Sequence, residues 1–336
     1  QIPPASTVWD GVSDDVRWNF EDRNAYSYTI STAAELTGVA ALVNGLVNED
    51  CVVYVSDTEK FTAEEWNESV YVNIEEHDDD GGNGLNKSTS VYHYGIEDFN
   101  GKTITLTDNI DMGGIYNKET DTWSGPNFMP IGGQYLMTKN DSSTKLSSSF
   151  CGTFDGGGHY VYNIYCDRHC ETGNFGDGQS VGLIGRLGVH DNDPVELRPV
   201  QPTVRNVGVT GYIYANRSVA GVVGKTGKTD YNNGNDNGYA LIENCVNYAR
   251  VIGTDAKGTG GVVGAFWNGG VCVNCYNMGN VTGGWPAGGI AASNENALEN
   301  CYNAGYIDST SGDNWGEAIG TFNGSSNHNV VNCWYL

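Results

Sequence analysis

A short phrase that ends in Asn-Cys recurs in the second half of the chain and limits its fold more than any other feature. Its four copies follow at intervals of 30, 26 and 32 residues, and two upstream stretches fit the same frame with Val or Ile in place of the cysteine. A position that accepts Cys, Val or Ile is an apolar slot, so the phrase predicts a buried column in which thiols act as small hydrophobic groups. The predicted column consists of Ile164, Val207, Cys245, Cys275, Cys301 and Cys333.

A second phrase, typified by Gly-Val-Val-Gly, keeps the same rhythm. Its copies lie at 181–185, 220–224, 260–264, 288–292 and 316–320. A further short stretch follows three of the Asn-Cys phrases, at 249–253, 279–283 and 305–309. One period therefore holds three short strands separated by Gly- and Asn-rich turns. Self-similarity at a period of about 20–50 residues is typical of solenoids, and three strands per period predict an all-β, parallel β-helix. Parallel crossovers make it right-handed.

The turns between these strands explain the 47 glycines among 336 residues. Each rung of a β-helix needs corners at which the backbone adopts positive φ, a conformation that Gly takes freely and Asn tolerates. We expect Asn247, Asn277 and Asn303, each two places after a column cysteine, to lie at such corners and to form a structural asparagine ladder.

Nine cysteines are an odd number, so they cannot all pair within one chain. The Cys272-x-x-Cys275 spacing resembles a metal motif, but residues three apart on a strand point to opposite faces. Cys166 and Cys170 are the better pair for a disulfide or a metal, and the sequence leaves open whether they are joined. We predict no metal site and no cofactor.

The charge balance sets limits on partners. Lys and Arg number 17 against 41 Asp and Glu, which gives a net charge of −24. An average surface of this charge repels nucleic acid. No apolar run approaches the about 18 residues of a membrane span, so membrane insertion is not expected. An acidic composition rich in Gly, Asn, Ser and Thr is typical of exported proteins, and the first residues do not form a signal peptide. We therefore expect a mature, extracellular segment.

Residues 1–100 are predicted to be a cap region and 101–336 the β-helix proper. Within the cap, Thr32 and Glu35 form a capping box ahead of an apolar 3.6-residue pattern, which predicts a helix over about 31–46. This helix is expected to cover the open end of the first rung. The acidic stretch 77–84 has oxygen ligands for calcium, but it lacks the spacing of a known calcium loop, so a solvated loop tip is favoured. The apolar end at 332–336 predicts further modules beyond Leu336.

Several phrases, in order, resemble the opening of GLUG-motif proteins. They are LTDNID at 106–111, MPIG at 129–132, FCGTFDGGGH at 150–159 and VGLIG at 181–185. The resemblance covers about residues 30–336, with a weaker stretch at 51–100. It implies a β-helix protein of the bacterial cell surface, of a kind whose modules also accompany immunoglobulin-A-cleaving metallopeptidases. The shared motif is architectural and does not specify an activity.

Catalysis is not the favoured function. A polysaccharide hydrolase needs two carboxylates on one face, and Asp108, Asp111 and Asp155 are the candidates. They lie in the GLUG-like phrases, where binding turn amides is the expected role. The six histidines show no His-Glu-x-x-His arrangement, so no zinc peptidase site is predicted.

Outward aromatic residues favour binding instead. Because the column cysteine points inward, the residue after it points outward, which gives a stripe of Val246, Tyr276, Tyr302 and Trp334. Three further tryptophans lie near the turns of the Gly-Val-Val-Gly strands. The predicted ligand-binding residues are Trp267, Trp285, Trp315, Tyr276 and Tyr302. The alternative is that outward aromatic residues only stabilise neighbouring rungs.

The sequence therefore predicts a non-catalytic, adhesin-like module that binds a host glycan or glycoprotein, such as immunoglobulin or mucin. Two alternatives stay open. One is a polysaccharide-cleaving β-helix enzyme, because this fold carries many activities. The other is a passive stalk that spaces other modules of a larger surface protein.

Overall fold

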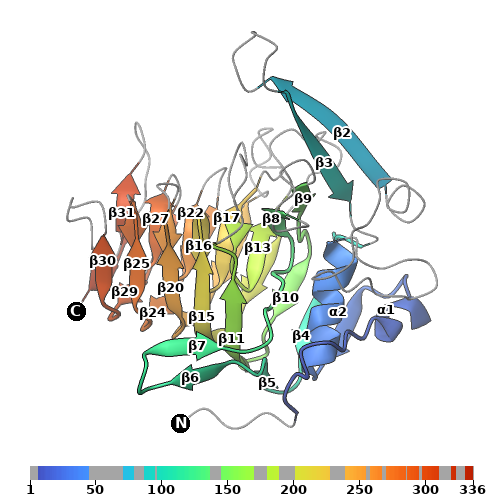
Figure 1. The fold of residues 1–336 in the computed structure, drawn as a ribbon, viewed down its shortest axis with the longest axis horizontal. Helices are drawn as coiled ribbons and strands as arrows, with labels where there is room; N and C mark the ends of the chain where they lie inside the picture. Colours follow the sequence, from blue (N-terminus) through green and yellow to red (C-terminus); the bar gives the residue numbers. More distant parts are fainter. Residues whose placement is uncertain are drawn as a thin grey trace.

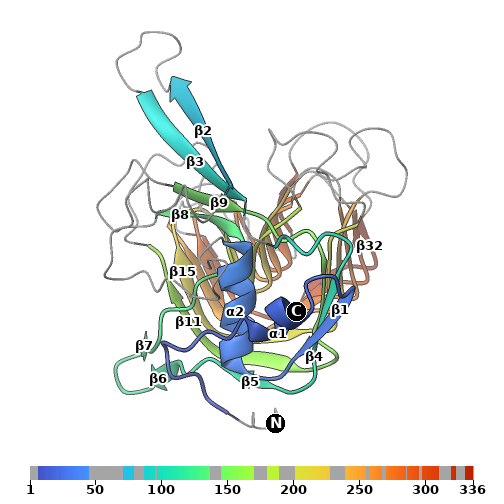
Figure 2. The ribbon, with the colours of Figure 1, turned by 90° about the vertical axis from the view of Figure 1, so that its right-hand side faces the viewer.

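The computed structural model describes residues 7–44, 71–78, 87–94, 97–136, 145–169, 180–188, 201–227, 239–254, 258–266, 270–284, 286–294, 297–309, 319–322 and 330–335. These residues form a solenoid of stacked parallel strands, with the two N-terminal helices at one end and the last strands at the other (Figure 1). The prediction of a parallel β-helix is confirmed. Seen from the N-terminal end, the chain turns clockwise as it recedes, which makes the solenoid right-handed (Figure 2).

Four parallel sheets run along the solenoid. The first sheet contains β1 (Ser27–Ile30), β4 (Thr103–Leu106), β10 (Thr153–Asp155), β14 (Thr203–Arg205), β18 (Ala240–Glu243), β23 (Gly270–Val273), β28 (Ala297–Glu299) and β32 (Val330–Val331). The second sheet contains β5 (Ile110–Asp111), β11 (Tyr160–Asp167), β15 (Gly208–Ala215), β19 (Val246–Asn247), β20 (Arg250–Gly253), β24 (Tyr276–Asn277), β25 (Val281–Gly283), β29 (Tyr302–Asn303), β30 (Ile307–Ser309) and β33 (Trp334–Tyr335).

The remaining two sheets are built from the Gly-Val-Val-Gly phrases. The third sheet contains β12 (Ser180–Val181), β16 (Ser218–Ala220), β21 (Thr259–Gly260) and β26 (Ala287–Gly288). The fourth sheet contains β13 (Ile184–Leu187), β17 (Val223–Thr226), β22 (Val263–Phe266), β27 (Ala291–Asn294) and β31 (Ile319–Phe322). Each phrase was expected to form one strand. The four copies between 181 and 292 instead span a corner, because one short strand ends at the start of each copy and another begins near its end.

The Asn-Cys phrase also spans a corner, and this corrects one prediction. Positive φ falls on the asparagine immediately before the column cysteine: Asn244 has φ 52°, Asn274 55° and Asn300 52°. The asparagines two places after the cysteine were expected there, but they lie in β19, β24 and β29. A rung such as 240–266 therefore holds five short strands in place of three.

Apolar side chains form columns through the interior. In the first sheet the register aligns Ile104, Phe154, Val204, Ile242, Cys272 and Leu298, all of which are buried. The structure places Val207, Cys245, Cys275 and Cys301 in a second column at the Asn-Cys corner, with Cys333 partly exposed at its end. Burial of apolar groups in every rung is the main force that holds such a solenoid together.

Ile164 does not belong to the cysteine column. It is buried, but it pairs with Gly211 in β15, and the register of β11 shifts between Val161 and Ile164. Ile164 therefore lies level with a position four residues past Val207, and the sequence frame that aligned it with the cysteines was wrong. The preceding Asn163 also has positive φ (57°), but it lies at this irregularity and not at the Asn-Cys corner. In that rung His159 lies level with Val207, because the backbone N–H of Gly208 donates to the carbonyl of His159.

A buried asparagine ladder crosses the interior beside the cysteines. The Nδ2 of Asn247 donates to Oδ1 of Asn277 at 2.8 Å, and Asn277 repeats this bond to Asn303 at 2.7 Å. The glycine at the second position of the 260–264 and 288–292 phrases makes room for an amide: a Cβ at Gly261 would lie 2.3 Å from Cγ of Asn277, and one at Gly289 2.2 Å from Cγ of Asn303. The two repeated phrases are therefore coupled through this contact.

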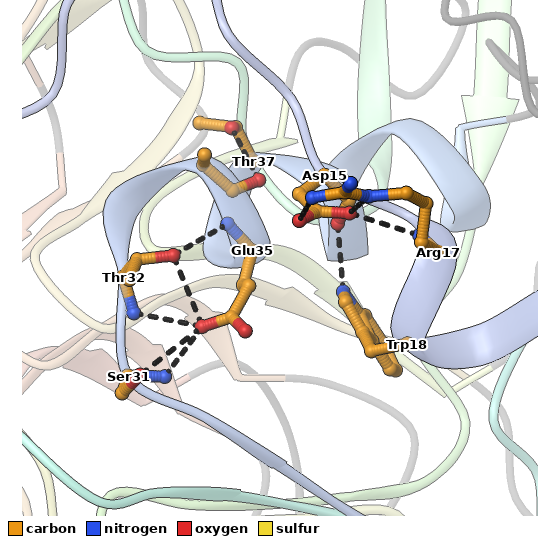
Figure 3. Close-up of polar contacts among 8 residues, drawn as sticks. Asp15, Arg17, Trp18, Ser31, Thr32, Glu35 and Thr37 are labelled. Carbon is orange, nitrogen blue, oxygen red and sulfur yellow. Dashed lines mark hydrogen bonds and ion pairs between the residues drawn. The ribbon is translucent and has the colours of Figure 1, made fainter. Parts of the chain in front are cut away.

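The predicted helix is α2 (Ala33–Val43), shorter at both ends than the expected 31–46. Its capping box is present: the N–H of Glu35 donates to the hydroxyl of Thr32, and the carboxylate of Glu35 accepts from the N–H of Thr32 (Figure 3). Leu36, Val39 and Leu42 are buried in the core, so the helix lies over the first rung as expected (Figure 2).

The segment before α2 packs on its outer side. Two residues of helix α1 (Arg17–Glu21) bind the preceding Asp15. The indole of Trp18 donates to the carbonyl of Asp15 at 2.7 Å, and the guanidinium of Arg17 pairs with its carboxylate (Figure 3). A Cβ at Gly38 of α2 would lie 2.0 Å from that same Asp15 carbonyl, so only glycine permits this close packing.

Three antiparallel hairpins leave the solenoid. They are β2 (Tyr71–Asp78) with β3 (Lys87–Tyr94), β6 (Ile115–Asn117) with β7 (Thr122–Ser124), and β8 (Gly133–Leu136) with β9 (Lys145–Ser148). The first of these occupies the stretch expected to interrupt the repeat. Of the acidic run 77–84, residues 77 and 78 end β2 and the others lie outside the described residues.

Candidate ligand-binding face

The outward side of the second sheet carries a row of aromatic residues. The strand register places Tyr276, Tyr302 and Trp334 in successive rungs at one position, and Tyr160 and Val246 occupy the same position earlier. Val246 is buried, whereas Tyr302 is 38% and Trp334 69% exposed. We call Tyr160, Tyr248, Tyr276, Tyr302 and Trp334 the tyrosine face.

The rings of the tyrosine face contact one another. Tyr276 and Tyr302 stack with centroids 4.9 Å apart and planes at 4°, and Tyr248 meets Tyr276 edge-on at 6.4 Å. Tyr160 in turn lies 6.4 Å from Tyr248. One broad face of each stacked ring is covered by its neighbour, so a ligand can meet only the other face, the ring edges and the hydroxyl group. The prediction that repeated aromatic faces are open to sugar rings is thus modified for Tyr276 and Tyr302.

The hydroxyl group of Tyr276 is neutral at physiological pH. Partial burial, together with a hydrogen bond to the hydroxyl of Tyr248 and the nearby phenols, raises the pKa of Tyr276 to about 12. A neutral phenol both donates and accepts a hydrogen bond, whereas a phenolate only accepts. The hydroxyl of Tyr276 therefore keeps both hydrogen-bonding functions.

A row of exposed amides runs beside the tyrosine face. The Nδ2 of each asparagine donates to Oδ1 in the preceding rung: Asn274 to Asn244 at 3.2 Å, Asn300 to Asn274 at 3.3 Å and Asn332 to Asn300 at 3.1 Å. Asn244 donates likewise to Asn206 at 3.0 Å. We call Asn206, Asn244, Asn274, Asn300 and Asn332 the amide row. Their positive φ directs them outward at the corner between the first and second sheets.

A second aromatic cluster lies on the same sheet, beneath the hairpin β6–β7. Trp123 of the hairpin stacks on Tyr212 of β15 at 6.4 Å, and Tyr212 stacks on Tyr165 at 6.0 Å. Arg250 bridges to Asp121 at the hairpin turn at 3.2 Å. These contacts fix the hairpin to the solenoid, and burial among them raises the pKa of Tyr212 to about 12.

The candidate carboxylates bind turn amides, as expected. Asp111 accepts from the N–H of Gly113 at 2.9 Å, and Asp108 accepts from the N–H of the following residue at 2.7 Å. Asp155 accepts from the N–H of Gly157, from the amide of Asn206 at 3.0 Å and from Arg205 at 2.8 Å. Although burial alone would raise its pKa, these bonds outweigh burial and hold the pKa of Asp155 below its usual value.

Cys275 of the Cys-x-x-Cys spacing is a fully buried thiol. Burial raises the pKa of the Cys275 thiol, which keeps it protonated, whereas metal ligation requires the thiolate. Among the residues that the structure describes, no group of three His, Cys, Asp or Glu side chains is arranged to hold a metal. Cys166 is buried, and Cys170 lies outside the described residues.

The predicted binding residues divide into two groups. Tyr276 and Tyr302 lie together on the tyrosine face, whereas Trp267, Trp285 and Trp315 lie outside the described residues. Sequence reasoning missed three further features of this wall: Tyr248 of the tyrosine face, the amide row, and the contact of Trp123 with Tyr212. Strand alternation from Val246 would have predicted an outward Tyr248, and the recurring Asn of the Asn-Cys phrase marks the amide row. No sequence signal links Trp123 to Tyr212, because a hairpin insertion brings them together.

These features define the protein as a parallel β-helix whose outer wall carries aligned aromatic and amide rows. Among solved structures, the chain is similar to one from Bacteroides ovatus described as a "putative immunoglobulin A1 protease", with 19% identity, a TM-score of 0.45, and coverage of 70% of this chain and 68% of that one. At this identity the similarity concerns the fold. No family model matches the sequence, and no curated protein matches it at a significant level. In the described part of the chain, no helix is long and apolar enough to cross a membrane.

Proposed function

We propose that this protein is a non-catalytic, extracellular binding module of the bacterial cell surface, which recognises a host glycan or glycoprotein through the tyrosine face. The observation that carries the proposal is the alignment of aromatic residues in successive rungs on the solvent side, with Tyr302 38% and Trp334 69% exposed. Extended solenoid walls commonly serve as binding surfaces. Aromatic rings with a polar tip are favoured where one side is apolar and the other is wet.

The polar neighbours of the tyrosine face support a carbohydrate ligand. The amide row supplies hydrogen-bond donors and acceptors without net charge, which suits the hydroxyl groups of sugars. The net charge of −24 disfavours polyanionic partners. The location is supported by the exported type of composition and by the resemblance of the 106–111, 129–132 and 150–159 phrases to GLUG-motif proteins.

The proposal is tested by glycan-array binding of the full chain. Tyr302→Ala and Trp334→Ala should each weaken binding to the best glycan at least about tenfold, which corresponds to about 1.4 kcal/mol. Tyr26→Ala is the matched control, because Tyr26 is 82% exposed but belongs to the N-terminal cap. Unchanged binding of both face variants would refute the assignment of the site.

The same samples separate the alternatives. Release of reducing ends from a bound polysaccharide would identify an enzyme, and no binding to any glycan or host glycoprotein would favour a stalk. Either outcome overturns the proposed function.

A further inference from the structure

We infer that the ligand is an uncharged polysaccharide segment that lies parallel to the solenoid axis, across successive rungs, between the amide row and the tyrosine face. This inference rests on the proposed function and specifies the ligand class, its direction, and the amide row as the polar half of the site. Three rungs carry both halves, in the pairs Asn274 with Tyr276, Asn300 with Tyr302, and Asn332 with Trp334.

The two rows run side by side because one residue separates them in each of these three rungs. That residue is the column cysteine, which points inward: Cys275 and Cys301 are fully buried. Neither row therefore has a side chain of the same rung standing between it and the other. Adjacent rungs are about 4.8 Å apart, so the combined surface repeats along the axis at that interval. A ligand with its own regular repeat along its length fits such a surface better than a compact one.

The amide row keeps unused hydrogen-bonding capacity. A side-chain amide has two N–H donors and a carbonyl oxygen with two lone pairs. Within the row, Asn300 uses one N–H toward Asn274 and one lone pair toward Asn332. Among the bonds of the described residues, Asn274 and Asn300 each keep one N–H donor and one lone pair for an outside partner. The chain of mutual bonds also fixes each amide in one orientation, which lowers the entropy lost on binding.

The charges along the strip favour an uncharged ligand. On the first sheet, Glu243 and Glu299 immediately precede Asn244 and Asn300 and are partly exposed. Carboxylates at this border repel uronic or sialic acid groups, and the net charge of −24 acts in the same direction. On the other border, the hydroxyl of Tyr276 stays protonated at neutral pH because of its raised pKa of about 12, so this group adds no charge.

The direction of the ligand predicts how affinity depends on length. A chain that lies along the axis contacts a new pair of amide and aromatic groups as it reaches each further rung. Affinity should therefore rise with every sugar added, up to the length that spans the three paired rungs. A ligand lying across the axis, or a single-sugar pocket, would show little gain beyond one or two units.

The experiment is calorimetric titration of the full chain with neutral glucan, mannan and galactan oligosaccharides of one to eight units, and with uronic acid oligomers of the same lengths. We expect affinity for at least one neutral series to rise at least about tenfold between one and four units, and uronic oligomers to bind at least about tenfold more weakly. Affinity independent of length, or equal binding of the uronic oligomers, would overturn the inference.

Two variants test the polar half directly. Asn300→Asp tolerates positive φ but replaces the amide donors by a charge, and Tyr302→Phe removes only the hydroxyl. Each should weaken binding of the longest oligomer about three- to tenfold while leaving the circular dichroism spectrum unchanged. Asn100→Asp is the control, because Asn100 is exposed in the turn before β4. This substitution adds the same negative charge away from the amide row.

The outcomes also separate this inference from the proposed function. If Tyr302→Ala abolishes binding but Asn300→Asp and Tyr302→Phe bind like the unmodified chain, the inference fails and the proposed function stands. If no glycan binds, both fail.

Discussion

Replacement of Asn277 by Ala should strongly destabilise the solenoid. The Asn277 side chain is fully buried and makes four hydrogen bonds: it donates to Gly279 O at 2.9 Å and to Asn303 at 2.7 Å, and it accepts from Gly279 N at 3.2 Å and from Asn247 at 2.8 Å. These four bonds use both amide protons and both lone pairs. The substitution therefore leaves four buried polar groups without this partner.

The magnitude follows from that count. A buried donor or acceptor that loses its partner costs about 1–3 kcal/mol. Water can enter the space left by the amide and recover part of this loss, so we expect about 4 kcal/mol in total rather than the upper limit. Such a loss is a large fraction of the about 5–15 kcal/mol that stabilises a typical domain.

The assay is urea unfolding followed by circular dichroism, with hydrogen exchange measured in parallel because solenoids can unfold by segments. Asn280→Ala is the matched control: Asn280 lies in the same rung but is exposed, so its loss should change stability by no more than about 0.5 kcal/mol. If Asn277→Ala unfolds within about 1 kcal/mol of the unmodified protein, the buried ladder does not stabilise the fold as argued.

Three further outcomes are expected. Gly261→Ala should lower the free energy of unfolding, measured in urea, by about 3 kcal/mol, because the new Cβ would lie 2.1 Å from a backbone oxygen. Gly101→Ala is the control and should lower it by only about 1–2 kcal/mol, because Gly101 has φ +73° but open space around it. Equal losses in the two variants would contradict this reasoning. Because the pKa of Asp155 is lowered in the folded protein, its ionised carboxylate stabilises the fold above about pH 4, and this stabilisation is lost as the pH falls through the lowered pKa. Between about pH 5 and pH 2, Asp155→Asn should therefore lose less stability than the unmodified protein, measured by urea midpoints. Trp123→Ala removes the stacking on Tyr212 and should markedly speed hydrogen exchange in the β6–β7 hairpin. Arg250→Ala should speed it only slightly, since an exposed ion pair contributes about 0–1 kcal/mol. The reverse order would show that the ion pair holds the hairpin.

Repeats make the fold of this chain predictable from its sequence. Stacked rungs require like residues at like positions, so the cysteines of the Asn-Cys phrase and the glycines of the second phrase marked the columns. The capping box of Thr32 and Glu35 marked the start of the helix, because those contacts are local.

Errors arose where a residue's role depends on its neighbours in other rungs. The sequence offers two asparagines in each phrase, such as Asn244 and Asn247, and both suit a corner. Stacking decided between them, since only the second has the glycine of an adjacent segment against its amide. Ile164 was misaligned because the preceding Asn163 takes positive φ as the corner asparagines do, although it lies at the irregularity within β11.

The candidate site shows the same division. The sequence by itself determined that Tyr276 and Tyr302 point outward, because side-chain direction alternates along a strand. Only the tertiary structure decided that their rings stack on each other at 4.9 Å and that the amides of Asn274 and Asn300 join into a row beside them. The physical reason is that a strand fixes the direction of its own side chains, whereas which faces and hydrogen-bonding groups stay open depends on the rung stacked against it.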